Sequence, residues 1–149
     1  MTEPRRIWWA RPRKLCALER PGGGGRSHRP DRRAEEIEWL KDAGVRTVVS
    51  IMQTRHNFAA YEEAGLVAIH HPLDPEDEDA AGDAIMLLRR LTKKAGAVAI
   101  HDNRYTDVLA GLCAAHLYDV RGADPLAALE AAAAAGMTIT AHSHRLAYL

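Results

Sequence analysis

The sequence has few cysteines and no long apolar run, and both shortages exclude whole classes of protein. Its two cysteines, Cys16 and Cys113, stand in apolar surroundings at no metal-ligand spacing, which predicts buried free thiols rather than a disulfide framework. No segment approaches the roughly 18 to 20 apolar residues that a membrane span requires, and residues 1–14 lack the apolar centre of a secretory signal. We therefore expect a soluble, cytoplasmic protein that makes no use of a membrane.

The sequence also lacks net charge, because 20 Lys and Arg balance 20 Asp and Glu over 149 residues. The charges are unevenly spread, since residues 1–33 contain ten basic and three acidic residues. A basic segment can hold an anionic partner, although charge runs are usually solvated and residues 20–33 have the glycine content of a mobile loop. We expect a single domain over residues 1–149, in which residues 1–33 form a basic strand and a glycine-rich loop.

From residue 30 onward, short apolar runs alternate with segments of helical spacing. Asp31 is the expected N-cap of the first helix and Gly44 its end, while Asp124 and Pro125 begin a later helix that Gly136 ends. The expected helices cover residues 31–44, 59–65, 78–96, 106–122 and 124–136, and the strands between them cover residues 45–52, 66–73 and 97–101. Strands that alternate with helices predict an α/β three-layer sandwich with a mainly parallel central sheet.

Chemically reactive side chains gather where the expected core strands end. In an open parallel sheet, ligands bind beyond the carboxyl ends of the strands. The segments that follow these strands hold two carboxylates and four of the eight histidines, namely Asp74, Asp102, His56, His70, His71 and His101. The expected fold therefore predicts a site at this edge. By contrast, His142 and His144 are expected in a polar segment near the C-terminus rather than in a zinc site.

The order of these segments resembles that of the cysteine-dependent dual-specificity and tyrosine phosphatases over most of residues 7–135. The likeness rests on the runs GVRTVVSIM, LVAIHHPLD and AVAIH, the last of which leads through a loop into a helix. In that family the strand ends in a His and the loop reads H-C-x-x-G-x-x-R-[S/T]-G. His101 matches the first position of this signature, and Asp74, 28 residues before Asp102, fits the place of the family's general acid.

The rest of the signature is different in this chain. Asp102 stands at the nucleophilic Cys, Tyr105 at the first Gly and Val108 at the Arg, with Leu109 and Ala110 at the last two positions. A carboxylate repels a phosphate dianion, whereas the family's thiolate attacks it. Loss of the Arg removes the bidentate phosphate clamp, and a Tyr obstructs the close backbone approach that glycine permits. Cysteine-based phosphatase activity is therefore not expected, because neither cysteine lies in the loop.

Two functions stay open after this comparison. In the first, the chain is a pseudophosphatase, a binding or regulatory module whose partner is an anionic small molecule or a phosphorylated protein. In the second, it is a repurposed hydrolase in which Asp102, His101 and Asp74 serve as acid, base or metal-binding groups in the same crevice. The sequence requires no cofactor and no metal, nucleic acid is not expected as a partner, and the oligomeric state is left open.

Individual residues of the loop have competing interpretations. Asp102 can cap loop amides in place of a phosphate, or it can act as a base or nucleophile. His101 is expected to be a buried orienting residue, and Asp107 is the expected N-cap of the next helix. Arg104 and Arg55 are the expected contacts for a phosphate or carboxylate group. The candidate ligand-binding residues are Asn103, Arg104, Tyr105, Thr106, Asp107 and Arg55.

Overall fold

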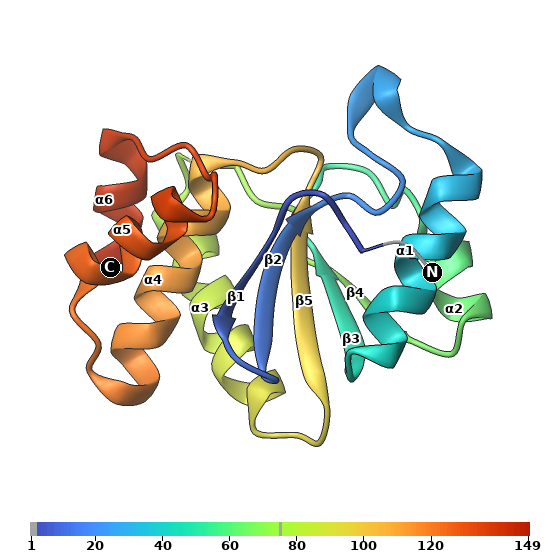
Figure 1. The fold of residues 1–149 in the computed structure, drawn as a ribbon. Helices are drawn as coiled ribbons and strands as arrows, with labels where there is room; N and C mark the ends of the chain where they lie inside the picture. The colour runs from blue at the N-terminus through green and yellow to red at the C-terminus, as the bar shows by residue number, and fades with distance from the viewer. Residues whose placement is uncertain (1–2, 75) are drawn as a thin grey trace.

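The computed structural model describes residues 3–74 and 76–149, which contain a central five-stranded sheet (Figure 1). The strands lie in the order β1-β2-β5-β3-β4. The first pair, β1 and β2, is an antiparallel hairpin, and all other neighbours pair in parallel. The strands are β1 (Ile7–Arg11), β2 (Leu15–Glu19), β3 (Val45–Ser50), β4 (Val67–His70) and β5 (Ala97–Asp102). The expected mainly parallel sheet is confirmed.

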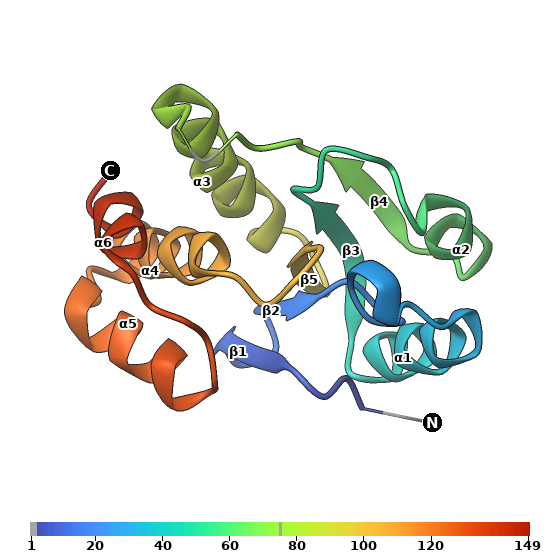
Figure 2. The same ribbon diagram turned by 90° about the horizontal axis from the view of Figure 1, so that it is seen from above.

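Helices cover both faces of this sheet, as Figure 2 shows from above. On one face lie α1 (Pro30–Asp42) and α2 (Phe58–Glu63). On the other lie α3 (Glu78–Thr92), α4 (Asp107–Arg121), α5 (Pro125–Ala134) and α6 (Ala141–Ala147). A single turn of 3-10 helix, η1 (Gly25–Ser27), stands in the loop between β2 and α1. The predicted three-layer α/β sandwich is thus confirmed.

The strands alternate their side chains between two apolar cores, as the period of two in a strand requires. In β5, Val98 and Ile100 join the core beneath α3 to α6, while Ala97 and Ala99 join the core beneath α1 and α2. Because β5 lies in the middle of a parallel sheet, it is buried on both faces and reads as a continuous apolar run. This burial holds the end of β5, and the loop after it, in a fixed place.

The C-terminal segment around His142 and His144, expected only to be polar, forms a helix. Thr140 begins α6 with a capping box, in which its hydroxyl accepts the amide of Ser143 and the Ser143 hydroxyl accepts the amide of Thr140. Leu146 is 2% exposed and packs against α4 at Gly111, where an added Cβ would lie 2.7 Å from the Leu146 Cβ. Tertiary packing of these few apolar side chains, which a short polar segment does not reveal, stabilises the helix.

The start of α1 also differs from the prediction. The helix begins at Pro30 with Arg29 as its N-cap, so Asp31 lies inside the first turn instead of capping it. Proline is favoured in the first turn because its missing N–H is not needed there. Both cysteines are buried and free, as predicted. Over residues 3–74 and 76–149, no helix combines the length and the apolar composition needed to cross a membrane.

Candidate functional site

The carboxyl ends of the parallel strands meet at one edge of the sheet, at the top of Figure 1. Two of the loops that leave this edge lie against each other, the loop after β2 and the loop after β5. We call residues 103–106 the β5 loop and residues 20–29 the β2 loop. The β5 loop follows β5 as the expected signature loop does, so its geometry bears on both functions that the sequence leaves open.

The Asp102 carboxylate turns back onto its own loop. Its Oδ1 accepts the amide of Asn103 at 2.7 Å, and its Oδ2 accepts the hydroxyl of Thr106 at 3.2 Å. Burial raises the pKa of Asp102, and the two hydrogen bonds oppose that rise. The Thr106 hydroxyl also accepts the amide of Leu109 at 3.4 Å and is the N-cap of α4. The carboxylate is therefore an internal acceptor that joins the end of β5 to the start of α4.

Two positions that carry phosphate-binding groups in the signature belong to the apolar core here. Tyr105 is 7% exposed, packs into the core beneath α3 to α6, and donates its hydroxyl to the Ala135 carbonyl at 3.4 Å. Val108 is 6% exposed and lies in the same core. Neither side chain can clamp an anion above the loop, because each is turned inward and packed.

Asp107 does not cap α4, so that prediction is wrong. It is the first residue of the helix, and its Oδ2 accepts the hydroxyl of Thr140 at 2.7 Å. Its carbonyl accepts the hydroxyl of Ser143 at 2.9 Å. These two bonds hold the start of α6 against the start of α4. The shorter Thr106 side chain stands one position earlier and takes the capping role, which threonine at an N-cap commonly does.

His101 is completely buried beneath the β5 loop, as the resemblance predicted for an orienting residue. Its Nδ1–H donates to the Asp102 carbonyl at 3.4 Å, and its Nε2 accepts the hydroxyl of Tyr61 at 2.8 Å. Burial lowers the pKa of His101 to about 4, so the imidazole is neutral near pH 7. The ring therefore faces Tyr61 on α2 and not the open side of the loop.

Asp74 and Arg55 lie apart from these contacts. Asp74 is exposed, and its Oδ1 accepts the amide of Glu76 at 3.0 Å. Arg55 is exposed as well, with its guanidinium carbon 4.3 Å from the ring centroid of Phe58. Within the described part of the chain, no hydrogen bond or ion pair joins either residue to the β5 loop. A shared role with Asp102 stays a prediction for both.

The glycine-rich β2 loop packs directly on the β5 loop. A Cβ on Gly24 would lie 1.7 Å from the Asn103 carbonyl oxygen, so only glycine allows this approach. The Gly25 amide donates to the Asn103 Oδ1 at 3.0 Å, and the Arg20 amide donates to the Asp102 carbonyl at 2.9 Å. Residues 20–24 are buried, which contradicts the expectation that this segment is a mobile loop.

The buried Arg20 of the β2 loop lies at the same edge, although it is not among the residues predicted for the site. Arg20 is only 4% exposed, and it follows β2 as directly as Asp102 ends β5. The rule that sites lie beyond strand ends points to Arg20 once β2 is recognised as a parallel neighbour of β5. Residues 1–33 alone do not show that residues 15–19 form a separate strand beside β5, so the pattern gives no reason to place a site at their end.

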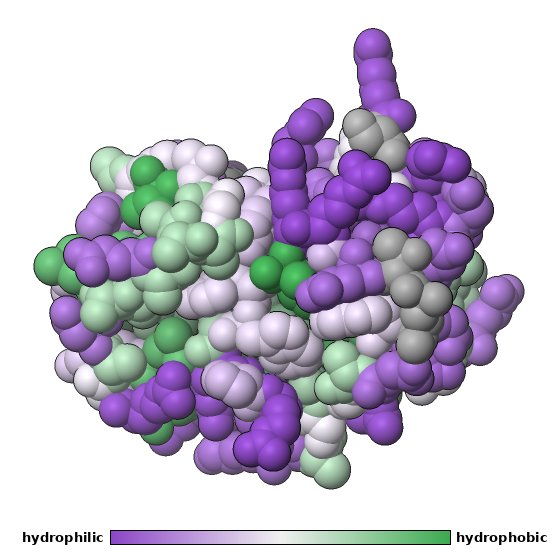
Figure 3. All heavy atoms as spheres, viewed as in Figure 1, coloured by the Kyte–Doolittle hydropathy of each residue, from purple (hydrophilic) through white to green (hydrophobic). Residues whose placement is uncertain are grey.

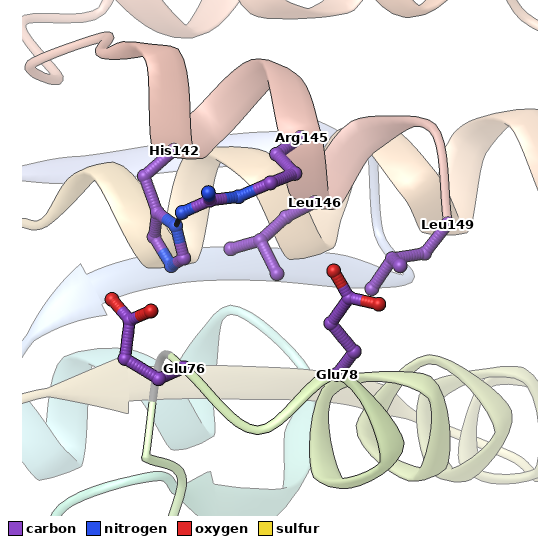
Figure 4. Close-up of a pocket in the computed structure, with 6 residues that line it drawn as sticks. All are labelled: Glu76, Glu78, His142, Arg145, Leu146 and Leu149. Carbon is purple, nitrogen blue, oxygen red and sulfur yellow. Dashed lines mark hydrogen bonds between the residues drawn. The ribbon is translucent and has the colours of Figure 1, made fainter.

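A small pocket of about 50 Å³ lies elsewhere, between α6 and the start of α3 (Figure 4). His142 points from α6 toward Glu76, and Arg145 runs along α6 toward His142, where its guanidinium donates to the His142 Nδ1 at 2.5 Å. His144 is exposed and does not join them. In the described ranges, no group of three His, Cys, Asp or Glu side chains is arranged to hold a metal ion.

The fold is that of the dual-specificity and tyrosine phosphatases. No family model and no curated protein matches the sequence. Human DUSP28 superposes with a TM-score of 0.71 at 17% identity, over 99% of this chain and 95% of that one. P. aeruginosa TpbA superposes with a TM-score of 0.70 at 18% identity, over 91% of this chain and 79% of that one. Tk-PTP in its active form superposes with a TM-score of 0.72 at 13% identity, over 95% of this chain and 92% of that one. At such identities the likeness concerns the fold alone.

Proposed function

We propose that this chain, which has the phosphatase fold, is a pseudophosphatase that acts as a binding or regulatory module and performs no thiol-based phosphate hydrolysis. One observation carries the proposal. Asp102 stands where the resemblance places the nucleophilic Cys, and its carboxylate is already bonded to the Asn103 amide and the Thr106 hydroxyl. A carboxylate in that place repels a phosphate dianion and fills part of the space that the dianion would need.

The inward packing of Tyr105 and Val108 supports the same conclusion. Stabilisation of developing charge is usually the largest contribution to catalysis, and in phosphoryl transfer arginine and backbone amides provide it. Val108 brings no charge, and Tyr105 is tied to the core and to the Ala135 carbonyl. The β5 loop therefore lacks both the nucleophile and the clamp that thiol-based hydrolysis requires.

No other thiol can replace the missing nucleophile. Cys16 in β2 and Cys113 in α4 are both completely buried. Burial raises the pKa of Cys16 well above its usual range and that of Cys113 to about 12. Because the thiolate is the reactive form, both side chains are inert packing groups near neutral pH.

The alternative, a hydrolase that uses Asp102, His101 and Asp74, has weaker support. Acid and base groups must reach the same substrate within hydrogen-bonding distance or through one water. His101 is neutral and faces Tyr61 beneath the loop, and Asp74 bonds to its own loop at the Glu76 amide. The binding module therefore agrees better with the geometry.

The test is an aryl phosphate assay with and without vanadate. We expect no turnover above a heat-inactivated sample, and no rise in the melting temperature with vanadate. Asp102→Asn is the matched variant, because it keeps an oxygen acceptor but removes the negative charge. Turnover that vanadate inhibits contradicts the proposal. Turnover that Asp102→Asn abolishes and vanadate leaves unchanged supports the repurposed hydrolase instead.

Asp102→Cys tests whether a nucleophile alone is sufficient. The new thiol lies just before the N-terminus of α4, where a thiol pKa falls, so we expect rapid alkylation near neutral pH. Aryl phosphatase activity should stay absent, because the Arg clamp and open backbone cradle are still missing. The alkylation rate and turnover are measured on the same sample. High turnover in this single variant would mean that the loop already binds phosphate.

A further inference from the structure

Two arginines and two histidines converge where the β2 loop meets α1 and the loop after β3. We call Arg20, His28, Arg33 and His56 the cationic cluster, after the charge of its two guanidinium groups. The Arg20 guanidinium donates to the Nδ1 of His56 and, through Nε, to the Gly23 carbonyl at 3.3 Å. The His28 Nδ1–H donates to the same carbonyl at 3.1 Å. Arg20, Arg33 and His56 lie close enough to His28 to lower its pKa, after burial as the main cause.

The cluster contains a buried charge that has no counter-ion among the residues that the structure describes. Arg20 is 4% exposed, and burying a guanidinium is costly unless an anion compensates it. In the described ranges, no carboxylate oxygen lies within ion-pairing distance of any member of the cluster. Burial and the neighbouring Arg33 both lower the pKa of Arg20, as expected for a cation among cations. The Arg20 guanidinium therefore has hydrogen-bond acceptors, but no anion balances its charge among the described residues.

The nearest carboxylates are bonded to other groups. Glu36 is buried, and its two oxygens accept the Gly22 amide at 2.7 Å and the Arg32 Nε at 3.3 Å. Glu19 accepts the second Arg32 nitrogen at 3.5 Å. Arg32 thus takes the local negative charge, although Arg20 is more deeply buried. This pairing leaves the cluster positive.

The cluster is also held in place before any ligand arrives. Asn57, which has a left-handed backbone, accepts the Arg33 guanidinium at 3.4 Å and donates to the Pro21 carbonyl at 2.9 Å. Because Arg20 occupies the Nδ1 of His56, the exposed ring of His56 keeps its Nε2–H free to donate. Groups that are fixed in this way bind with a smaller loss of conformational entropy.

The surroundings favour an approaching anion as well. Hydrophilic side chains crowd the part of the surface that covers η1 and α1 in Figure 3. Arg26 is exposed on this part of the chain, just before α1, whereas the exposed Arg29 is paired with Asp31 at 3.2 Å. A concentration of positive charge raises the local concentration of anions. Arg20 is only 4% exposed, so the ligand group has to be compact, and a terminal phosphate is more compact than the phosphodiester backbone of a nucleic acid.

We propose that the cationic cluster binds the terminal phosphate group of a phosphomonoester, in a site that is separate from the β5 loop. Arginine suits this ligand because its fork of N–H donors matches the phosphate oxygens. The inference rests on the proposed function in one respect, since it names the ligand class of the binding module. The phosphate comes either from a small phosphomonoester or from a phosphorylated protein side chain, and the chemistry of recognition is the same.

Calorimetry in phosphate-free buffer tests the site with four probes: inorganic phosphate, phenyl phosphate, a phosphotyrosine peptide and the same peptide without phosphate. The variants are Arg33→Gln and His56→Gln. Arg104→Gln reports on the alternative site in the β5 loop, and Arg90→Gln, at an exposed position of α3, is the matched control. We expect phosphate to bind the unmodified chain, each cluster variant to weaken it about ten-fold, and the Arg90→Gln control to bind normally. Bound phosphate should also raise the pKa of His28 in an NMR titration, which a merely misfolded variant would not report.

The outcomes separate the two ligand sources and the two proposals. Equal affinity for phenyl phosphate and the phosphopeptide indicates a small-molecule ligand, and tighter peptide binding indicates a phosphorylated protein. Absence of binding, equal binding by the cluster variants, or loss of binding only in Arg104→Gln overturns the inference. Aryl phosphate turnover measured on the same samples would overturn the proposed function while leaving the phosphate site intact, so the two failures are distinguishable.

Discussion

The two segments that touch at the edge of the sheet hold partly or fully buried groups of opposite charge. At the end of β5, just before the β5 loop, the carboxylate of Asp102 accepts the Asn103 amide and the Thr106 hydroxyl. In the β2 loop, the buried guanidinium of Arg20 donates to a carbonyl and a histidine and has no anion beside it. The loop that resembles a phosphate cradle is therefore filled from within, and its neighbour is the loop that lacks a counter-ion.

This difference shows that fold and anion binding can be separated within one edge of a sheet. The phosphatase fold fixes where the loops leave the strands, but the side chains decide which loop attracts an anion. Arg20 and Asp102 stand on adjacent strands and are joined by a backbone hydrogen bond of 2.9 Å. Each loop can be changed by itself, which makes the comparison open to experiment.

The largest expected effect comes from lowering the pH, which protonates the buried imidazole of His101 beneath the β5 loop. The pKa of His101 is lowered from 6.5 to about 4, so the unfolded chain takes up a proton first as the pH falls. His101 should therefore stabilise the fold fully above pH 6.5, and about 3 kcal/mol should be lost between pH 6.5 and 4. Urea unfolding across this range measures the loss.

His101→Gln is the matched variant for that experiment, and His116 provides an internal comparison. His116 is equally buried, and its pKa is also lowered to about 4. Removing the imidazole of His101 should make the free energy of unfolding depend less on pH. The part of the pH dependence that comes from His116 should remain. An unchanged slope in His101→Gln would show that His101 carries no such linkage.

Gly24→Ala should break the contact between the loops. The new Cβ would lie 1.7 Å from the Asn103 carbonyl oxygen, and backbone cannot move aside cheaply. We expect the free energy of unfolding to fall by about 1 to 3 kcal/mol, as overpacking usually costs. Gly82→Ala in α3 is the control, because an added Cβ there meets nothing and should stabilise by about 0.5 to 1 kcal/mol. Similar losses in both variants would contradict the account.

Asp102→Ala measures the internal acceptor of the β5 loop. Loss of its bonds to the Asn103 amide and the Thr106 hydroxyl should lower stability by about 0.5 to 2 kcal/mol, as loss of a helix cap does. Asp102→Asn retains an acceptor and should lose less. Thermal melting compares the three proteins. A melting temperature that rises in Asp102→Ala would mean that the carboxylate is held there against stability.

The smallest expected effect is that of Arg20→Met. This variant tests most directly the contrast between the compensated Asp102 and the uncompensated Arg20. Methionine keeps much of the volume and removes the buried charge that no carboxylate compensates. In phosphate-free buffer we expect stability to rise by about 1 kcal/mol. The stabilisation that added phosphate gives to the unmodified chain should disappear in this variant. A loss of stability greater than about 1 kcal/mol would show that the guanidinium is well compensated within the fold.

The sequence by itself determined the architecture and the departures from the phosphatase signature. Apolar runs such as residues 97–101 are buried on both faces because the chain alternates strands with helices, and this pattern is local. The sequence likewise shows Asp102 and Val108 at the signature positions of Cys and Arg, and it shows the apolar surroundings of both cysteines. Each of these conclusions depends on residue type and order and on no contact between distant segments.

Only the tertiary structure decided which side chains share a site. The burial of Gly24 against Asn103 joins residues far apart in the chain, and no periodicity reports such a contact. The same holds for α6, a short helix that is stabilised because its few apolar side chains pack on α4. It also holds for the cationic cluster, since Glu36 bonds to the Gly22 amide and to Arg32 and makes no ion pair with the buried Arg20. Compensation of charge depends on distances in space, and the order of residues does not contain them.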